Sequence, residues 1–145
     1  MAAVLITPAG ARSSGGYPRP VPAGDPDAEL ATEVGRLADR LRQLSESRLR
    51  RRYAELGDQT AAEAGHALAQ WFADAAARLT DGDPAARWAV PRLTDLAVGD
   101  QVAVTGTDLV AASVTGSPTS EPAGAERAAV VAEALERAQR LRRAV

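Results

Sequence analysis

Residues 25–44 read DPDAELATEVGRLADRLRQL and carry the clearest structural signal in this 145-residue chain. Large apolar residues recur in this stretch at spacings of four, three, four and three, which is typical of one buried helix face; they are Leu30, Val34, Leu37, Leu41 and Leu44. Asp25 suits the N-cap of such a helix, and Pro26 and Asp27 suit its first turn. The pattern therefore predicts an amphipathic helix that begins near residue 26.

The apolar stripe loses its phase after Leu44, because the next leucine is Leu49. Five helical residues rotate that side chain by roughly 140° from Leu44. Two serines between them favour an interruption, so we expect the helix to break or bend at 45–47. A short second helical piece is expected over 48–56, ended by Gly57.

Residues 60–79 predict a second helix. Thr60 and Glu63 have the spacing of a capping box, in which each side chain accepts a hydrogen bond from the backbone amide of the other residue. The apolar stripe behind this box consists of Ala64, Leu68, Trp71, Ala75 and Leu79. The turn sequence Asp81-Gly-Asp-Pro84 is expected to end the helix.

The end of the chain predicts a further helix, opened by the sequence Thr119-Ser-Glu-Pro122. Its apolar stripe keeps heptad spacing and consists of Val131, Ala134, Ala138, Leu141 and Val145. Two glutamate–arginine pairs on this helix have the spacing and order of stabilising i,i+4 ion pairs; they are Glu133 with Arg137 and Glu136 with Arg140.

Residues 84–97 predict an ordered loop, marked by Trp88 and Pro91. Large aromatic side chains dominate the energetics of protein cores. We therefore expect Trp88 to cover the end of the core rather than to serve as a binding platform.

Residues 98–116 allow two interpretations. In a helix, Val98, Val102 and Leu109 lie near one face. In a hairpin, the strand Gln101-Val-Ala-Val-Thr105 alternates and the following Gly-Thr-Asp turns the chain. Glycines and β-branched residues favour strands locally, but a two-stranded hairpin without partner strands is marginal. A helix is therefore favoured, and the hairpin stays open as the alternative.

Together these segments predict an all-α fold, a small bundle of three to four helices. Residues 1–25 contain many prolines and glycines and are expected to form a flexible, disordered arm. Residues 26–145 are expected to form a single α-helical domain. Only 3% of the residues are aromatic, which predicts close packing between alanine-rich helix faces, and the heptad-like stripes leave room for a helix from a second subunit.

The residue content argues against several chemistries. The chain has no cysteine, which excludes disulfides and thiolate metal sites. Its single histidine, His66, follows Glu63 at the spacing used by di-metal helical bundles. The second pair that such a site needs is missing, and His66 is expected to point to solvent. The serines lack a nucleophile elbow and the glycines lack a phosphate-binding motif, so we expect no catalytic, cofactor or metal residues and a protein that is not an enzyme.

Charge and hydropathy bear on location and partners. The formal net charge is -2 and the isoelectric point about 5.4, which argues against general binding to nucleic acid. No apolar run approaches the ~20 residues that cross a membrane, and the first residues lack the features of a signal peptide, so a cytoplasmic protein is expected. All 17 basic residues are arginine, as in proteins of high-GC bacterial genomes.

One basic patch stands out; its candidate interaction residues are Arg48, Arg50, Arg51, Arg52 and Tyr53. Arginines beside a tyrosine can clamp a phosphate or an acidic surface. The simpler interpretation is a solvated helix end that nearby acidic residues neutralise. The leading hypothesis is a helical protein that acts by binding another protein or a copy of itself. The alternative is a regulator that binds a small ligand or nucleic acid through this basic patch.

Overall fold

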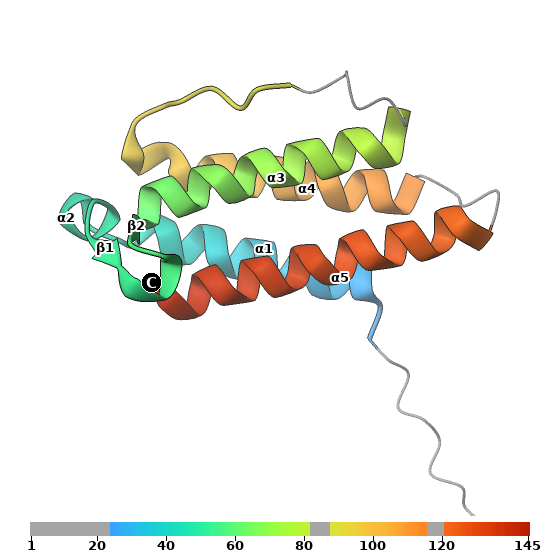
Figure 1. Cartoon of the computed structure of the whole chain (residues 1–145), viewed down its shortest axis with the longest axis horizontal. Helices are drawn as coiled ribbons and strands as arrows, with labels where there is room; N and C mark the ends of the chain where they lie inside the picture. The colour runs from blue at the N-terminus through green and yellow to red at the C-terminus, as the bar shows by residue number, and fades with distance from the viewer. Residues whose placement is uncertain (1–23, 82–87, 116–120) are drawn as a thin grey trace, which may run out of the picture.

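The computed structural model describes residues 24–81, 88–115 and 121–145, and Figure 1 shows their arrangement. The arm expected over residues 1–25 lies outside the described residues, apart from its last two. The long helices of the described part are α1 (Pro26–Arg42), α3 (Ala61–Asp81), α4 (Val98–Thr115) and α5 (Glu121–Ala144). The short elements are α2 (Glu46–Leu49), β1 (Arg52–Tyr53), β2 (Gln59–Thr60) and the 3-10 turns η1 (Ala54–Leu56) and η2 (Asp95–Ala97). The predicted all-α bundle is confirmed.

The long helices form two layers, with α3 and α4 in one layer and α1 and α5 in the other (Figure 1). Around the bundle their order is α3, α4, α1, α5. α4 packs extensively on both α3 and α1, and α5 packs mainly on α1. Contacts between α5 and α3 are much sparser, so the bundle closes least tightly along this seam.

α1 has the start and the buried face that its sequence predicts. The side chain of Asp25 accepts a hydrogen bond from the backbone amide of Asp27 at 3.1 Å, and Pro26 occupies the first turn. The predicted apolar stripe is buried along its whole length and consists of Leu30, Val34, Leu37, Leu41 and Leu44. This helix is therefore confirmed.

The break at 45–47 is also confirmed, because Ser45 caps the separate helix α2. The expected continuous helical piece over 48–56 is wrong, because α2 ends at Leu49 and β1 follows, but the 3-10 turn η1 over 54–56 does end at Gly57 as predicted. Gly57 and Asp58 both adopt left-handed backbone conformations, with φ of 66° and 64°. This turn brings β2 back alongside β1, so that the two pair antiparallel as a hairpin.

α3 starts at the predicted capping box but buries a different face. The Thr60 amide donates to the Glu63 carboxylate at 2.9 Å, and the Glu63 amide donates to the Thr60 hydroxyl at 3.1 Å. Of the predicted stripe, only Leu68 and Ala75 are buried. Phe72 is fully buried while its neighbour Trp71 is half-buried. The reason is that α3 turns toward α4, its closest neighbour, and leaves the predicted stripe partly on the α5 side.

Residues 98–115 form the helix α4 rather than the alternative hairpin. Gly106, which the hairpin interpretation placed in a turn, lies where α4 crosses α1. A Cβ atom at this position would lie 2.5 Å from Cγ1 of Val34 and 3.3 Å from Cε2 of Phe72. The missing side chain therefore lets α4 approach the core closely.

α5 confirms its predicted stripe and ion pairs. The stripe is buried and consists of Val131, Ala134, Ala138, Leu141 and Val145. The exposed pairs Glu133–Arg137 and Glu136–Arg140 each close at 2.7 Å. A further arginine of α5, Arg142, pairs with the buried Glu33 of α1. The strongest polar attachments of α5 thus lie on the α1 side.

Candidate docking surface

The exposed large apolar side chains of the described residues all lie between positions 88 and 114; they are Trp88, Leu93, Leu96, Val104 and Val114. Trp88 is 81% exposed, so the prediction that it covers the end of the core is wrong. Phe72 fills the core instead, with the ring of Trp71 edge-on to it at a centroid distance of 6.0 Å. Trp88 is therefore left on the surface, in the segment that leads to α4.

Trp88 stands at the rim of a mostly apolar hollow of about 470 Å³ between this segment and α4, which we call the Trp88 groove. α4 lines it with Asp100, Gln101, Val104, Thr105 and Asp108. The segment before α4 contributes Trp88, Ala89, Val90, Pro91, Leu93 and Ala97, and α3 contributes Ala73. The groove thus follows the outer side of α4.

Two glutamines hold the rim of the Trp88 groove in place. Gln70 of α3 donates to the carbonyl of Trp88 at 3.1 Å and accepts from the amide of Val90 at 2.8 Å. Gln101 of α4 donates to the carbonyl of Pro91 at 2.6 Å. Backbone without regular secondary structure is thereby fixed to two helices, so the shape of the rim is set by the bundle itself.

The charge of the groove is negative. α4 contains no basic residue, and its charged side chains Asp100 and Asp108 both line the hollow. Arg42 of α1 donates to Asp100 at 2.8 Å, whereas the described residues offer Asp108 no ion-pair partner. The nearby Arg92 lines a different, much smaller hollow beside His66.

The sequence contained one signal that points to this surface. Val104 and Val114 lie off the face that carries the buried Val102 and Leu109, so the apolar side chains of α4 are not confined to one side of the helix. A helix that is apolar on several sides is usually covered on several sides. In the described part of the chain Val104 and Val114 nevertheless remain exposed, and Val104 forms part of one wall of the groove.

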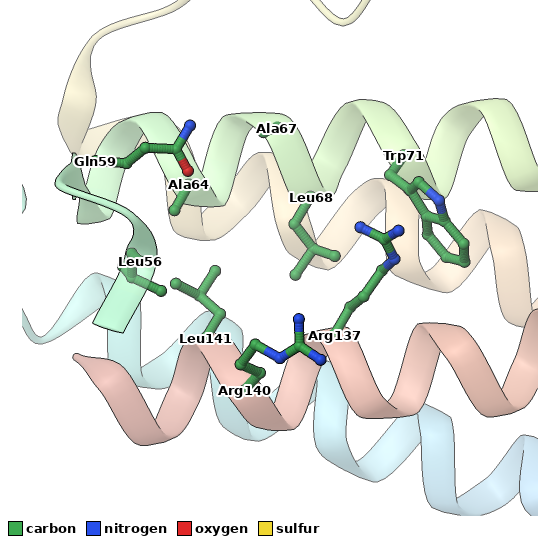
Figure 2. Close-up of a pocket in the computed structure, with 9 residues that line it drawn as sticks. All are labelled: Leu56, Gln59, Ala64, Ala67, Leu68, Trp71, Arg137, Arg140 and Leu141. Atoms are coloured by element: carbon green, nitrogen blue, oxygen red, sulfur yellow. The ribbon is translucent and has the colours of Figure 1, made fainter. Parts of the chain in front are cut away.

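A second hollow, of about 230 Å³, lies along the loose seam between α3 and α5 (Figure 2). Figure 2 shows Leu68 of α3 and Leu141 of α5 pointing into this gap, and Arg137 reaching from α5 toward Trp71. The Arg137 guanidinium lies 4.8 Å from the centre of the Trp71 ring and also pairs with Glu133. Since its charge is already met within the chain, we assign this hollow to helix packing.

The basic patch lies in α2 and the hairpin that follows. Arg50 pairs with Glu46 at 2.5 Å and with Asp95 at 3.1 Å. Arg52 donates to the carbonyl of Asp58 at 2.6 Å. Arg51 lies 5.8 Å from the ring centre of Tyr53, and Arg48 is exposed. Internal partners thus engage much of this patch, and its binding of an external ligand stays a prediction.

His66 is not where the sequence placed it. The prediction that it points to solvent is wrong, because its ring is half-buried and its Nδ1 atom is buried without a hydrogen-bond partner. The segment before α4 covers it with Arg92, Thr94 and Asp95. Within the described ranges, no three histidine or acidic side chains gather as a group that could hold a metal ion.

Comparisons of the chain with protein-family models, with curated protein sequences and with solved structures give no match. Among the described helices, none combines the length and the apolar content that a membrane crossing requires. The Trp88 groove and its chemistry are therefore the features of the molecule that bear on function.

Proposed function

We propose that this protein acts in the cytoplasm by binding another protein, and that the Trp88 groove is the surface it uses. The observation that carries the proposal is the 81% exposure of Trp88 at the rim of an apolar hollow. Exposed apolar patches on soluble proteins mark interaction sites. Tryptophan is one of the three side chains enriched among residues that dominate binding energy.

The dimensions of the groove suit a segment of protein. Its α4 wall runs from Asp100 to Asp108, which corresponds to roughly 12 Å, or just over two helical turns. A helix laid in a groove of this length contacts it through side chains at positions i, i+3 or i+4, and i+7. The hollow of about 470 Å³ has room for several such side chains.

The hydrogen bonds of Gln70 and Gln101 favour binding as well. They hold the rim in place before any partner arrives. Association then requires less ordering of the protein's own backbone, so more of the interaction energy remains as affinity.

Two valines of α4 provide a matched test. Val104 and Val114 are each 61% exposed, and only Val104 lines the groove. A photo-crosslinking amino acid at position 93, where the exposed Leu93 also lines the groove, would capture the partner in cells while Trp88 stays in place. The affinity of the purified partner would then be measured for Val104→Gln and Val114→Gln. We expect Val104→Gln to weaken binding at least tenfold and Val114→Gln to leave it unchanged.

The same pair carries its own control for folding. Both substitutions are at exposed helix positions, so both should alter the free energy of unfolding by less than about 0.5 kcal/mol. Equal affinities of the two variants, or no protein crosslinked at position 93, would refute the proposed function.

A further inference from the structure

The charges of the Trp88 groove indicate what kind of protein segment fits it, and this inference rests on the proposed function. The ionisable groups that line the groove are Asp100 and Asp108, with no basic side chain among the lining residues. Asp100 is 68% exposed despite its contact with Arg42. An apolar floor beneath two accessible carboxylates selects a ligand that is apolar on one side and cationic at its edge.

We propose that the partner presents an amphipathic helix with lysines or arginines beside its apolar stripe. Asp100 and Asp108 are eight residues apart on α4, which places them about 12 Å apart along the helix axis. Two basic residues about two turns apart on a partner helix can therefore meet both carboxylates while apolar residues between them contact Val104 and Trp88. Opposite charges also speed the first encounter.

A second copy of this chain fits the groove poorly. Every exposed large apolar side chain of the described residues lies at 88–114, in the segment before α4 or on α4 itself. The outward faces of α1 and α5 therefore offer no large apolar residue among the described positions. Two copies paired groove to groove would bring Asp100 and Asp108 toward their own copies, and like charges at an interface disfavour association.

The experiment uses two synthetic helical peptides of equal length with the same leucine stripe, one with lysine and one with glutamate at its polar positions. Binding to the full chain is followed by the fluorescence of Trp88, and Trp88→Phe identifies the part of the signal that comes from this residue. We expect the lysine peptide to shift the emission to the blue in a saturable way that weakens with added salt. The glutamate peptide should give no shift.

A matched pair of charge reversals locates the binding. Asp108→Lys should lower the affinity for the lysine peptide at least tenfold, because it reverses the charge of one side chain that lines the groove. Glu126→Lys makes the same change at an exposed position of α5 that does not line the groove, and should leave the affinity within twofold.

Other outcomes would overturn the inference in distinguishable ways. A Trp88-dependent shift with the glutamate peptide as strong as with the lysine peptide would refute the charge preference and leave the proposed docking function standing. No shift with either peptide would refute this inference, while the Val104 and Val114 variants decide the docking function separately. A shift that grows with protein concentration alone would assign the groove to a second copy. A blue-shifted Trp88 emission in the chain without peptide, which Leu5→Asp returns to longer wavelength, would assign residues 1–23 as the occupant of the groove.

Discussion

Arg127 near the start of α5 donates a hydrogen bond to the carboxylate of Asp27 in the first turn of α1, at 2.5 Å. Ser113 near the end of α4 donates to the other oxygen of the same carboxylate at 2.6 Å. Arg127 also donates to the carbonyl of Ser113. One buried acidic side chain of α1 thus joins its helix to α4 and α5, whose contacting residues lie 86 and 100 positions further along the chain. It does so at the end of the bundle opposite the hairpin (Figure 1).

Removal of Arg127 should destabilise the protein far more than removal of an exposed arginine. Arg127→Ala leaves the buried Asp27 carboxylate without its cation, and we expect a loss of about 2 to 3 kcal/mol in the free energy of unfolding. Arg140→Ala breaks the exposed pair with Glu136 and should lose less than about 1 kcal/mol. Urea denaturation of the two variants measures both values, and equal losses would contradict a structural role for the Asp27 contact.

Two helical glycines should respond to alanine with opposite signs. At Gly106 a Cβ atom would lie 2.5 Å from the Val34 side chain, and overpacking of this kind destabilises proteins by about 1–3 kcal/mol. At Gly35 in α1 a Cβ atom meets nothing within 4 Å, so Gly35→Ala should stabilise the protein by up to about 1 kcal/mol through helix propensity. Chemical denaturation measures both changes. A gain in stability for both variants would contradict the close approach of α4 to α1.

Stability should depend on pH through Glu63. The backbone amide of Thr60, which donates to the carboxylate, is the main cause that lowers the pKa of Glu63 below its usual range. Because the pKa is lower in the folded state, the charged carboxylate stabilises the protein above about pH 4.3, the ordinary value, and this contribution is lost as the pH falls through the folded pKa.

The variant Glu63→Gln isolates this contribution. It should be less stable than the wild-type chain at pH 7, and the difference should shrink toward zero in acid. Thermal unfolding monitored by circular dichroism over this pH range provides the measurement. A difference that stays constant, or that widens as the pH falls, would show that the Glu63 charge does not support the helix start.

Phe72 and Trp88 should differ strongly in how much each contributes to the free energy of unfolding. Phe72→Ala removes a fully buried ring and should cost about 3–5 kcal/mol. Trp88→Ala removes a ring that is 81% exposed and should change stability by less than about 0.5 kcal/mol. Denaturation midpoints check both values. A large loss for Trp88→Ala would mean that this residue supports the fold, as its sequence context first suggested.

Helices with local start signals were the most predictable part of the fold. The Asp25 cap and the Thr60–Glu63 box act within a few residues of themselves, so their effect is visible in the sequence. The buried face of α3 was less predictable, since it depends on which neighbour α3 approaches most closely. Trp71 and Phe72 are adjacent, and only the position of α4 determines that Phe72 is the one that enters the core.

The candidate site was the hardest part to predict. The rim of the Trp88 groove is held by Gln70 and Gln101, which belong to different helices and contact a segment with no periodicity of its own. His66 was misplaced for the same reason, because residues 92–95 pack over a face that the helical wheel assigned to solvent. Contacts between segments that lack a repeating pattern leave no trace in hydropathy spacing.

The sparse packing of α5 on α3 determines how the protein should open transiently. Release of α5 separates it mainly from α1, whereas release of α4 breaks its extensive interfaces with both α3 and α1. Local opening costs less free energy where an element buries fewer contacts with its neighbours. Amide hydrogens of α5 should therefore exchange with deuterated water sooner than those of α4, through a short-lived form in which α1, α3 and α4 remain together and keep the wall of the Trp88 groove intact.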